Sequence, residues 1–482
     1  KREFLFNLIF LILINLMIKP LYIFGIDVGV QNAVGPENYG LYFYLLGFIY
    51  LFQFINDFGI QNFNNRFISL NEKLLGKYFP HIFSLKMVLG LTFFALVIGV
   101  GLSLNLVELN PLLFFIVALN LFLDSLNAYL RSNIAGLGWY RRDSILSVTD
   151  KLIMIVICGL LLLNPVTREA FQIEWFALAQ TASFLCVTLL SLFYMRGKTA
   201  IRMHPPGRKY FFLILKKSWP FALILLSSFF YNRLDAVMIG WIMEDGERQA
   251  GYYAAGYRLY DAASMFTFLF AGLLYPMFSK MLSRGENPSG LYKMGIQLLW
   301  MISLAVLFVF IFIPSEIMHG LYLDPGPEAA TVLILLGFAF VFKSIFHISG
   351  SLMLSYGDLK VINIIFISGM ILNFILNAIL IPRTGIVGAC WATLITQGLV
   401  ALSLYYRSVK LSQYKVGIGL LMAGLSTGAL VALAAYYFQE FSGEFSLLQI
   451  VLVISSMLVL LGGISLFIVL NNSNRLRKWW TN

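Results

Sequence analysis

Ionisable side chains interrupt the long apolar runs of this chain, and they are the residues that could do chemistry. In the stretch FFYNRLDAVMIG, residues 229–240, Arg233 and Asp235 lie within a largely apolar run. A charge near mid-bilayer costs about 2.5–3.5 kcal/mol on insertion scales, so such residues usually pair, face a cavity or bind a ligand. Arginine and lysine bind phosphate and carboxylate groups, and the planar guanidinium suits two-point contact. The first hypothesis is therefore an anion-binding site inside a membrane.

The candidate site consists of basic residues in these runs and the acidic residues that hold them. The substrate-binding candidates are Lys19, Lys86, Arg233, Asp235, Arg258, Asp261 and Lys343. The other ionisable residues in the runs are Asp27, Asp57, Asp124, Arg131, Asp150 and Lys151. Helix geometry places Arg258 and Asp261 on one face, because they are three residues apart. Arg233 and Asp235 point to nearly opposite faces and need partners on other helices. The alternative is that all these charges form interhelical pairs with a purely structural role.

Depth along the expected helices divides the charges into layers. At 1.5 Å per residue, an outer layer contains Lys19, Arg233, Asp235, Arg258 and Asp261, and most of the other charges lie deeper. Tyr257 and Tyr260 lie beside Arg258 and are candidates for stacking on sugar rings, or for an ordinary aromatic belt. Histidines and cysteines show no metal-binding spacing, so no metal site is expected.

Membrane-spanning helices must position these residues. The chain has 482 residues, of which 60% are hydrophobic and 12% charged, whereas globular proteins contain about a quarter charged residues. Apolar runs of this length span a bilayer as helices, which predicts an all-α polytopic membrane protein. The expected spans are 5–31, 40–63, 79–104, 111–135, 143–164, 172–195, 212–242, 250–278, 291–317, 328–354, 359–381, 386–406, 414–438 and 446–470. The first is expected to be retained rather than cleaved, with a kink at Pro20.

The charges of the connecting segments predict the orientation. With both termini in the cytoplasm, the inner segments contain 24 Lys and Arg and 5 Asp and Glu, and the outer loops contain 3 and 12. This asymmetry follows the positive-inside rule. The net charge of +11 therefore reports topology, and no nucleic-acid partner is expected. The segment RMHPPGRK and the tail NRLRKWW indicate contact with lipids of the cytoplasmic leaflet.

Three pairs of segments indicate an internal repeat with an offset of six spans. They are 34–48 with 247–266, 135–148 with 354–365, and 174–196 with 389–407. Six helices return the chain to its starting side, so the halves share one orientation. The expected organisation is a six-helix lobe over 1–200, a second over 201–407, and a helix pair with a tail over 408–482. Two such parallel lobes are expected to face each other across a central cavity.

Several motifs form a recognisable pattern. They are VGPENYGLYFYLL and NDFGIQNFNNRF in the first lobe, NRLDAVMIGWI and GYYAAGYRLY in the second, and the Asn-rich segment LNFILNAILIPRTGIVGACWATLITQGL, residues 372–399. This pattern resembles that of the bacterial polysaccharide-biosynthesis flippases, which move O-antigen and capsule repeat units. These flippases belong to the multidrug/oligosaccharidyl-lipid/polysaccharide exporter superfamily, and the similarity covers the first twelve spans.

The resemblance implies a flippase that carries a polyprenyl-diphosphate-linked oligosaccharide to the outer leaflet by alternating access. It implies cavity cations under the pyrophosphate; Lys19, Arg233 and Arg258 match that pattern, whereas the second span offers only Asp57 and Arg66. Relatives couple to a proton gradient, a sodium gradient or the membrane potential, for which Asp27, Asp124 and Asp150 are candidates.

The resemblance also implies a place in the cell and a set of partners. It implies the bacterial inner membrane, no cofactor, and other polysaccharide-assembly membrane proteins as candidate partners. The alternatives are a multidrug cation antiporter of the same fold, a peptidoglycan-precursor flippase, and a membrane polysaccharide polymerase. The last would be an enzyme, and the short outer loops argue against it.

Overall fold

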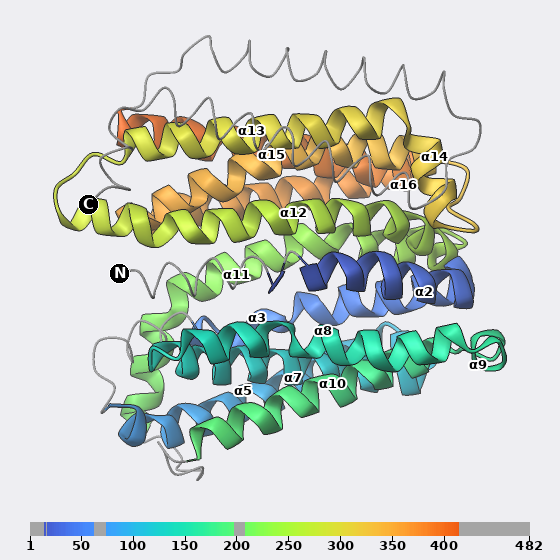
Figure 1. Cartoon of the computed structure of the whole chain (residues 1–482), viewed down its shortest axis with the longest axis horizontal. Helices are drawn as coiled ribbons and strands as arrows, with labels where there is room; N and C mark the ends of the chain where they lie inside the picture. The colour runs from blue at the N-terminus through green and yellow to red at the C-terminus, as the bar shows by residue number, and fades with distance from the viewer. Residues whose placement is uncertain (1–13, 16, 62–73, 197–207, 414–482) are drawn as a thin grey trace. The chain divides into compact units, whose positions relative to one another are not determined.

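The computed structural model describes residues 14–15, 17–61, 74–196 and 208–413, and every regular element in these ranges is a helix. The long helices are α2 (Val28–Leu51), α5 (Leu74–Ser103), α7 (Pro111–Gly136), α8 (Tyr140–Leu163), α10 (Ile173–Met195), α11 (Arg208–Ile242), α12 (Gly246–Ser283), α13 (Ser289–Phe312), α15 (Ala329–Tyr356) and α16 (Leu359–Ser412). The short ones are η1 (Tyr22–Asp27), α3 (Gln53–Asp57), α6 (Leu106–Leu109), α9 (Pro165–Glu169) and α14 (Pro314–Leu321) (Figure 1).

Nine helices of the described residues are long and apolar enough to cross a membrane. Most coincide with the expected spans within a few residues. The helix α16 contains two of them, because Thr384 and Gly385 leave the helical conformation two residues after Pro382. The last two expected spans, 414–438 and 446–470, lie outside the described residues, as do Arg66, the segment 197–207 and the C-terminal tail.

The first span ends in an irregular segment. Residues 17–21 are helical and Pro20 lies among them. The π-helix η1 follows directly, and the expected kink at Pro20 stays a prediction. Gly35, with φ +79°, separates the first span from the second immediately before Pro36. A positive φ is a conformation that glycine adopts easily, so this residue permits the turn.

The second span is broken, although the sequence analysis treated 40–63 as continuous. The helix α2 ends at Leu51, and α3 ends at Phe58, which has a left-handed backbone. Between these breaks lie three buried polar residues, Gln53, Asn56 and Asp57. Their hydrogen bonds to neighbouring helices hold this segment in place, as described below.

The described chain divides into two compact units, Lys1–Gly251 and Tyr252–Asn482, which are treated separately. The boundary at Gly251 lies about fifty residues after the expected lobe boundary at residue 200, because α11 packs against α2 and α3. Glycines permit the close approach: a Cβ on Gly240 would collide with the Tyr44 ring, and one on Gly47 would lie 3.4 Å from the carbonyl oxygen of Arg233. The expected lobes 1–200, 201–407 and 408–482 stay a prediction.

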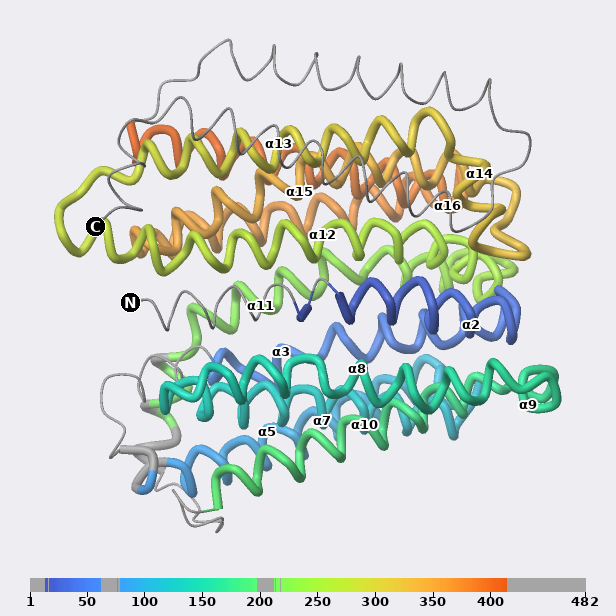
Figure 2. The backbone as a smooth tube through the Cα atoms, viewed as in Figure 1, coloured from blue at the N-terminus to red at the C-terminus, as the bar shows by residue number. Residues whose placement is uncertain are grey.

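In the first unit α5, α7, α8 and α10 lie side by side (Figure 2). Two equivalent sets of side-chain hydrogen bonds, which we call the Asn–Thr clasps, join α7 to α10. Asn120 donates to the carbonyl oxygen of Ala177 at 2.9 Å and accepts from Thr181 at 2.6 Å. Seven residues along both helices, Asn127 donates to the carbonyl oxygen of Phe184 at 3.0 Å and accepts from Thr188 at 2.8 Å. Side-chain hydrogen bonds of this kind hold helices together in membranes.

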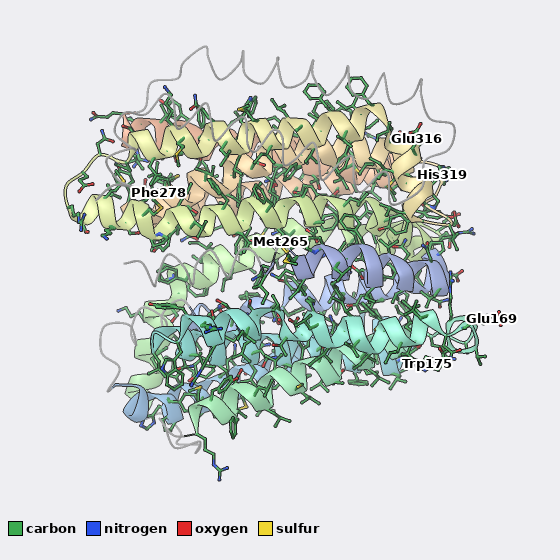
Figure 3. All side chains as sticks on the ribbon, in the orientation of Figure 1. Glu169, Trp175, Met265, Phe278, Glu316 and His319 are labelled. Atoms are coloured by element: carbon green, nitrogen blue, oxygen red, sulfur yellow. The ribbon has the colours of Figure 1, made fainter. Side chains whose placement is uncertain are left out.

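The short helix α9 connects α8 to α10, with Glu169 and Trp175 at the same end of this unit (Figure 3). It begins with an Asn-Pro pair, as α7 does. The Asn164 side chain accepts from the backbone N–H of Val166 at 3.1 Å, and Asn110 accepts from that of Leu113 at 3.0 Å. An Asn N-cap followed by proline at the first helical position is a strong helix start.

The second unit has a core contributed by α12, α13, α15 and α16, with Phe278, Tyr292, Ile348 and Ala401 among its buried residues. Its α15–α16 turn corresponds to the α7–α8 turn of the first unit in the expected repeat. Both turns contain a glycine with φ +75°, Gly138 and Gly357.

After the glycine of each turn, an aspartate forms an ion pair with an arginine. Asp143 accepts from Nε of Arg131 at 2.8 Å, and Asp358 accepts from Nε of Arg407 at 2.7 Å. In the first unit the arginine lies on the helix before the turn, and in the second it lies near the end of α16. The two turns therefore share the glycine conformation and the aspartate, but the arginine that pairs with the aspartate comes from a different position in each unit.

Candidate functional site

The helix α7 has two exposed stripes. In its N-terminal half the stripe is apolar and contains Leu112, Phe115 and Leu119, which are 59%, 46% and 39% exposed. In its C-terminal half the stripe contains Asp124, Ala128, Arg131 and Ala135, which are exposed or partly exposed and share one face. Lipid-facing residues account for the first stripe. The second is polar and lies among buried residues such as Leu123 and Ser125, as expected for a surface that meets water or a ligand.

Charges from two further segments lie near the polar stripe. Asp143, Asp150 and Lys151 come from α8, and Lys19 comes from the helical residues 17–21. We name Lys19, Asp124, Arg131, Asp143, Asp150 and Lys151 the charged wall. Asn15 joins the start of the described chain to α8, because it donates to Ser147 Oγ at 3.2 Å. Lys151 also places Nζ 4.6 Å from the Tyr22 ring centre.

The charged wall behaves as one electrostatic cluster. Lys151, Asp150, Arg131 and Asp124 all act on the charge of Lys19. Asp150, Lys151 and Arg131 also act on Asp124. The structure brings Lys19 near Asp124 and Asp150. Its place in an outer layer with Arg233 and Arg258 stays a prediction.

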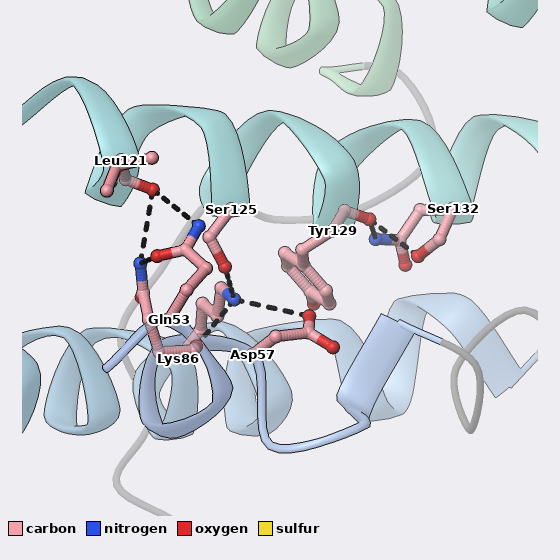
Figure 4. A network of polar contacts seen from close by, with 9 residues as sticks. Gln53, Asp57, Lys86, Leu121, Ser125, Tyr129 and Ser132 are labelled. Atoms are coloured by element: carbon pink, nitrogen blue, oxygen red, sulfur yellow. Dashed lines mark hydrogen bonds and ion pairs between the residues drawn. The ribbon is translucent and has the colours of Figure 1, made fainter. Parts of the chain in front are cut away.

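Lys86 lies in a buried network instead (Figure 4). Its side chain is 0% exposed, and Nζ donates to the carbonyl oxygen of Asn56 at 2.7 Å and to Ser125 Oγ. Asp57 Oδ1 lies 3.6 Å from the ammonium group. The network ties α3 to α5 and α7, so Lys86 already has protein partners, and its contact with substrate stays a prediction.

Gln53 completes the attachment of α3. Its Nε2 donates to the carbonyl oxygen of Leu121 at 2.9 Å, and Asn56 donates to the same oxygen at 3.3 Å. Gln53, Asn56 and the Asn–Thr clasps were not among the residues expected from the sequence. The sequence signal that could have indicated them is an amide side chain in an otherwise apolar run.

Asp27, a candidate for ion coupling, is buried in η1. It is 2% exposed, and Oδ1 accepts a hydrogen bond from the Tyr39 hydroxyl at 2.8 Å. Tyr39 lies on α2 beyond the break at Gly35. The contact therefore joins the two sides of the turn, and a role of Asp27 in coupling stays a prediction.

Arg233 lies beside aromatic rings of α2. Its guanidinium carbon is 5.6 Å from the Phe43 ring centre and 5.5 Å from that of Tyr50. Asp235 is 2% exposed, whereas Arg233 is partly exposed, in agreement with side chains that point to different faces. Stacking on two rings orients the guanidinium of Arg233.

The candidates of the second unit gather on α12 and α15. Tyr253, Tyr257 and Tyr260 form a row, with ring centres 5.5 and 5.3 Å apart, and Lys343 Nζ lies 4.5 Å from the Tyr260 ring centre. Tyr257 and Tyr260 are only 3% and 2% exposed. Both rings already contact protein groups, and their contact with sugars stays a prediction.

Arg258 and Asp261 are both partly exposed and lie three residues apart on α12. This spacing brings their side chains to neighbouring positions on the helix. The outer layer expected from the sequence combines Arg258 with Arg233 across the two units, and it stays a prediction.

Comparisons with known proteins bear on the family and the fold. The family model described as "Polysaccharide biosynthesis protein" matches residues 4–282, more than half of the chain. An uncharacterized membrane protein of Methanocaldococcus jannaschii, MJ1375, is 29% identical over 183 residues, which cover 38% of this chain. The chain thus spans less than half, 42%, of the curated relative that it matches.

Two solved structures show the same fold. The lipid II flippase MurJ in an inward closed conformation has a TM-score of 0.66 at 15% identity, with 98% of this chain and 99% of that chain covered. An outward-facing multidrug resistance MATE family transporter of the MOP superfamily has a TM-score of 0.58 at 18% identity, covering 84% and 95%. Together with the nine candidate spans, these findings establish an all-α multi-span membrane protein of the MurJ and MATE type. The match over residues 4–282 shows that the chain belongs to the polysaccharide biosynthesis protein family.

Proposed function

We propose that this protein is a flippase for a polyprenyl-diphosphate-linked oligosaccharide of the O-antigen or capsule type. It moves its substrate from the cytoplasmic to the outer leaflet by alternating access. The observation that carries the proposal is the accessible charged wall, on helices that are otherwise apolar, in a member of the polysaccharide biosynthesis family. A purely lipid-handling protein has no need of such charges, which are costly in a membrane and usually serve function.

Basic residues in the helices of both units suit an anionic headgroup. The first unit contributes Lys19 and Arg233, and the second contributes Arg258 and Lys343. Hydrogen bonds to charged groups contribute about 1.5–3 kcal/mol each, and arginine contacts phosphate oxygens at two points. In this proposal the diphosphate binds the cations, and the polyprenyl chain stays in the bilayer.

The proposed orientation has both termini in the cytoplasm of a bacterial cell and follows from the charges of the connecting segments. In this orientation Glu169 on α9 and Glu316 on α14 lie outside. The Arg131–Asp143 and Arg407–Asp358 pairs lie at the cytoplasmic ends of their helices.

The experiment is native mass spectrometry of the gently purified protein with its co-purified lipid. Wild-type protein is expected to retain a polyprenyl-diphosphate oligosaccharide. Arg258→Ala is expected to lower the retained fraction about tenfold or more, which corresponds to one lost charge-assisted contact. Arg284→Ala is the matched control, because Arg284 is half-exposed and pairs with Glu286 in the turn that follows α12.

Two other results would change the conclusion. If the variant holds the lipid as well as the wild type, the flippase proposal stands and Arg258 is not an essential phosphate ligand. If no such lipid is found and organic cations bind saturably, the protein is instead a multidrug antiporter.

A further inference from the structure

One exposed face of α8 is apolar along its length and basic at its beginning. Ile145, Leu152, Val156 and Leu160 are exposed, and their spacing of seven, four and four residues places them on one side of the helix. Arg142 lies three residues before Ile145, in the first turn of α8, and is exposed on the same side. We name these five residues the α8 stripe.

The neighbouring helix α10, which packs against α8, has a similar face. Leu185, Leu189 and Phe193 are exposed at intervals of four residues. Arg196, three residues after Phe193, is exposed and has a helical backbone at the end of α10, so it continues this face. We name these four residues the α10 stripe. Each stripe therefore combines an apolar surface with an exposed arginine at one end.

Two aromatic rings hold Arg142 and bring the basic ends of the stripes together. Its guanidinium carbon lies 4.4 Å from the Trp139 ring centre and 5.1 Å from that of Tyr194, which is on α10 two residues before Arg196. Both rings pack against the buried core cluster of the first unit, which includes Leu146. A guanidinium that is already stacked on anchored rings has less freedom to lose when it binds a ligand.

The arginines of the two stripes are not neutralised by carboxylates of the described residues. Asp143, which follows Arg142, is paired with Arg131 at 2.8 Å. Within the parts of the chain that the structure describes, Arg142 and Arg196 make no ion pair within 4.0 Å. In the second unit, by contrast, the corresponding segment of the expected repeat ends at Arg407, which is paired with Asp358 at 2.7 Å.

We propose that the α8 and α10 stripes bind an anionic phospholipid. Its phosphate accepts hydrogen bonds from the guanidinium groups of Arg142 and Arg196, and its acyl chains lie along the apolar residues of the stripes. In the proposed orientation this end of the helices faces the cytoplasmic leaflet, where basic residues beside spanning helices attract anionic lipids. This lipid is not the proposed substrate, so the inference does not depend on the flippase proposal.

Other ligands fit the two stripes less well. A free phosphate would use the arginines and make no contact with the apolar residues. A zwitterionic phospholipid would cover the apolar residues but would bring its own cation toward the arginines, and like charges repel. An anionic phospholipid satisfies both parts of the surface.

Native mass spectrometry of the full-length protein, titrated with phosphatidylglycerol or with phosphatidylcholine of the same acyl chains, is the test. Wild-type protein is expected to bind phosphatidylglycerol at least fivefold more tightly than phosphatidylcholine. Arg142→Gln is expected to abolish this preference. Lys360→Gln is the matched control, because Lys360 is an exposed lysine directly after the corresponding turn of the second unit, and it is expected to leave the preference unchanged.

Further measurements separate the built site from a general attraction between charges. Tyr194→Leu removes no charge but removes one of the rings that hold Arg142, and it is expected to weaken phosphatidylglycerol severalfold. Tyr194→Phe keeps a ring and is expected to bind like the wild type, which controls for a folding defect. Inorganic phosphate in large excess is expected to leave phosphatidylglycerol bound.

Four results would overturn the inference. If the wild type binds both phospholipids equally, the anionic class is refuted. If Arg142→Gln and Lys360→Gln weaken phosphatidylglycerol equally, the binding reports overall charge and the site is refuted. If inorganic phosphate displaces the lipid, the arginines form an anion site without a lipid. If undecaprenyl diphosphate binds more tightly than phosphatidylglycerol and depends on Arg142, the arginine serves the substrate instead.

Discussion

At the scale of single residues, the structure separates charges that have protein partners from charges that face a surface. Lys86 and Lys19 are both lysines in apolar runs, and the sequence analysis treated both as substrate ligands. Lys86 is fully buried with three partners, whereas Lys19 lies on the accessible charged wall. Sequence could show that both are costly in a membrane. It could not tell them apart, because the partners of Lys86 lie on helices at least 29 positions away.

Lys86→Met is expected to destabilise the protein strongly. The substitution leaves the Asp57 carboxylate without its counter-charge, and breaking a buried pair in this way costs about 3–5 kcal/mol. Thermal unfolding in detergent is the measurement, with Lys293→Met as an exposed control. The double variant Lys86→Met/Asp57→Asn is expected to recover part of the loss, since no buried charge remains. A Lys86→Met protein that melts like the wild type would show that the network is dispensable.

At the scale of helices, the sequence predicted most spans but not how they are joined. The expected spans 111–135 and 172–195 agree closely with α7 and α10, because apolar length is a local property. The break of the second span at Phe52 and Phe58 was missed. Buried amides hold that break, and the carbonyl oxygen they contact, on Leu121, belongs to a distant helix.

The two Asn–Thr clasps between α7 and α10 are expected to contribute independently. Asn120→Leu and Asn127→Leu should each lower stability by about 0.6–1.7 kcal/mol, the range for side-chain hydrogen bonds between membrane helices. The double variant should lose about the sum, since the clasps are separated by two helical turns and share no partner. Unfolding in mixed micelles measures the loss. Thr149→Val, which removes only a bond to Ile145 of its own helix, is the control. A double variant no weaker than either single one would contradict independence.

At the scale of the whole molecule, family and fold agree with the sequence, whereas orientation and substrate are proposals. The positive-inside rule uses only the charges of connecting segments, so it needs no packing information. The site could be predicted only as a set of residue types. Which charges meet depends on how helices that are distant in the sequence pack together, and the sequence did not indicate the π-helix η1 in the first span.

The proposed orientation can be tested by cysteine labelling. After replacement of Cys158, Cys186 and Cys390, single cysteines are introduced as Glu169→Cys and Lys360→Cys. A membrane-impermeant maleimide added to intact cells is expected to label Glu169→Cys at once and Lys360→Cys only after permeabilisation. Both positions are exposed at helix ends, so accessibility alone does not limit the reaction. The reverse pattern would invert the topology and place the charged wall toward the opposite leaflet.

The Lys86 network also has a consequence for how the chain enters the membrane during synthesis. Asn56 and Asp57 are made about thirty residues before Lys86, because the ribosome works from the N-terminus. Two of the three partners of the ammonium group are therefore already present when it leaves the insertion machinery, and only Ser125 follows. The helices α3 and α5 can accordingly enter lipid together, with the Lys86 charge balanced by Asp57. Ribosomes stalled between Lys86 and Ser125 should then carry both helices already integrated in the bilayer, and replacing Asp57 should delay that integration.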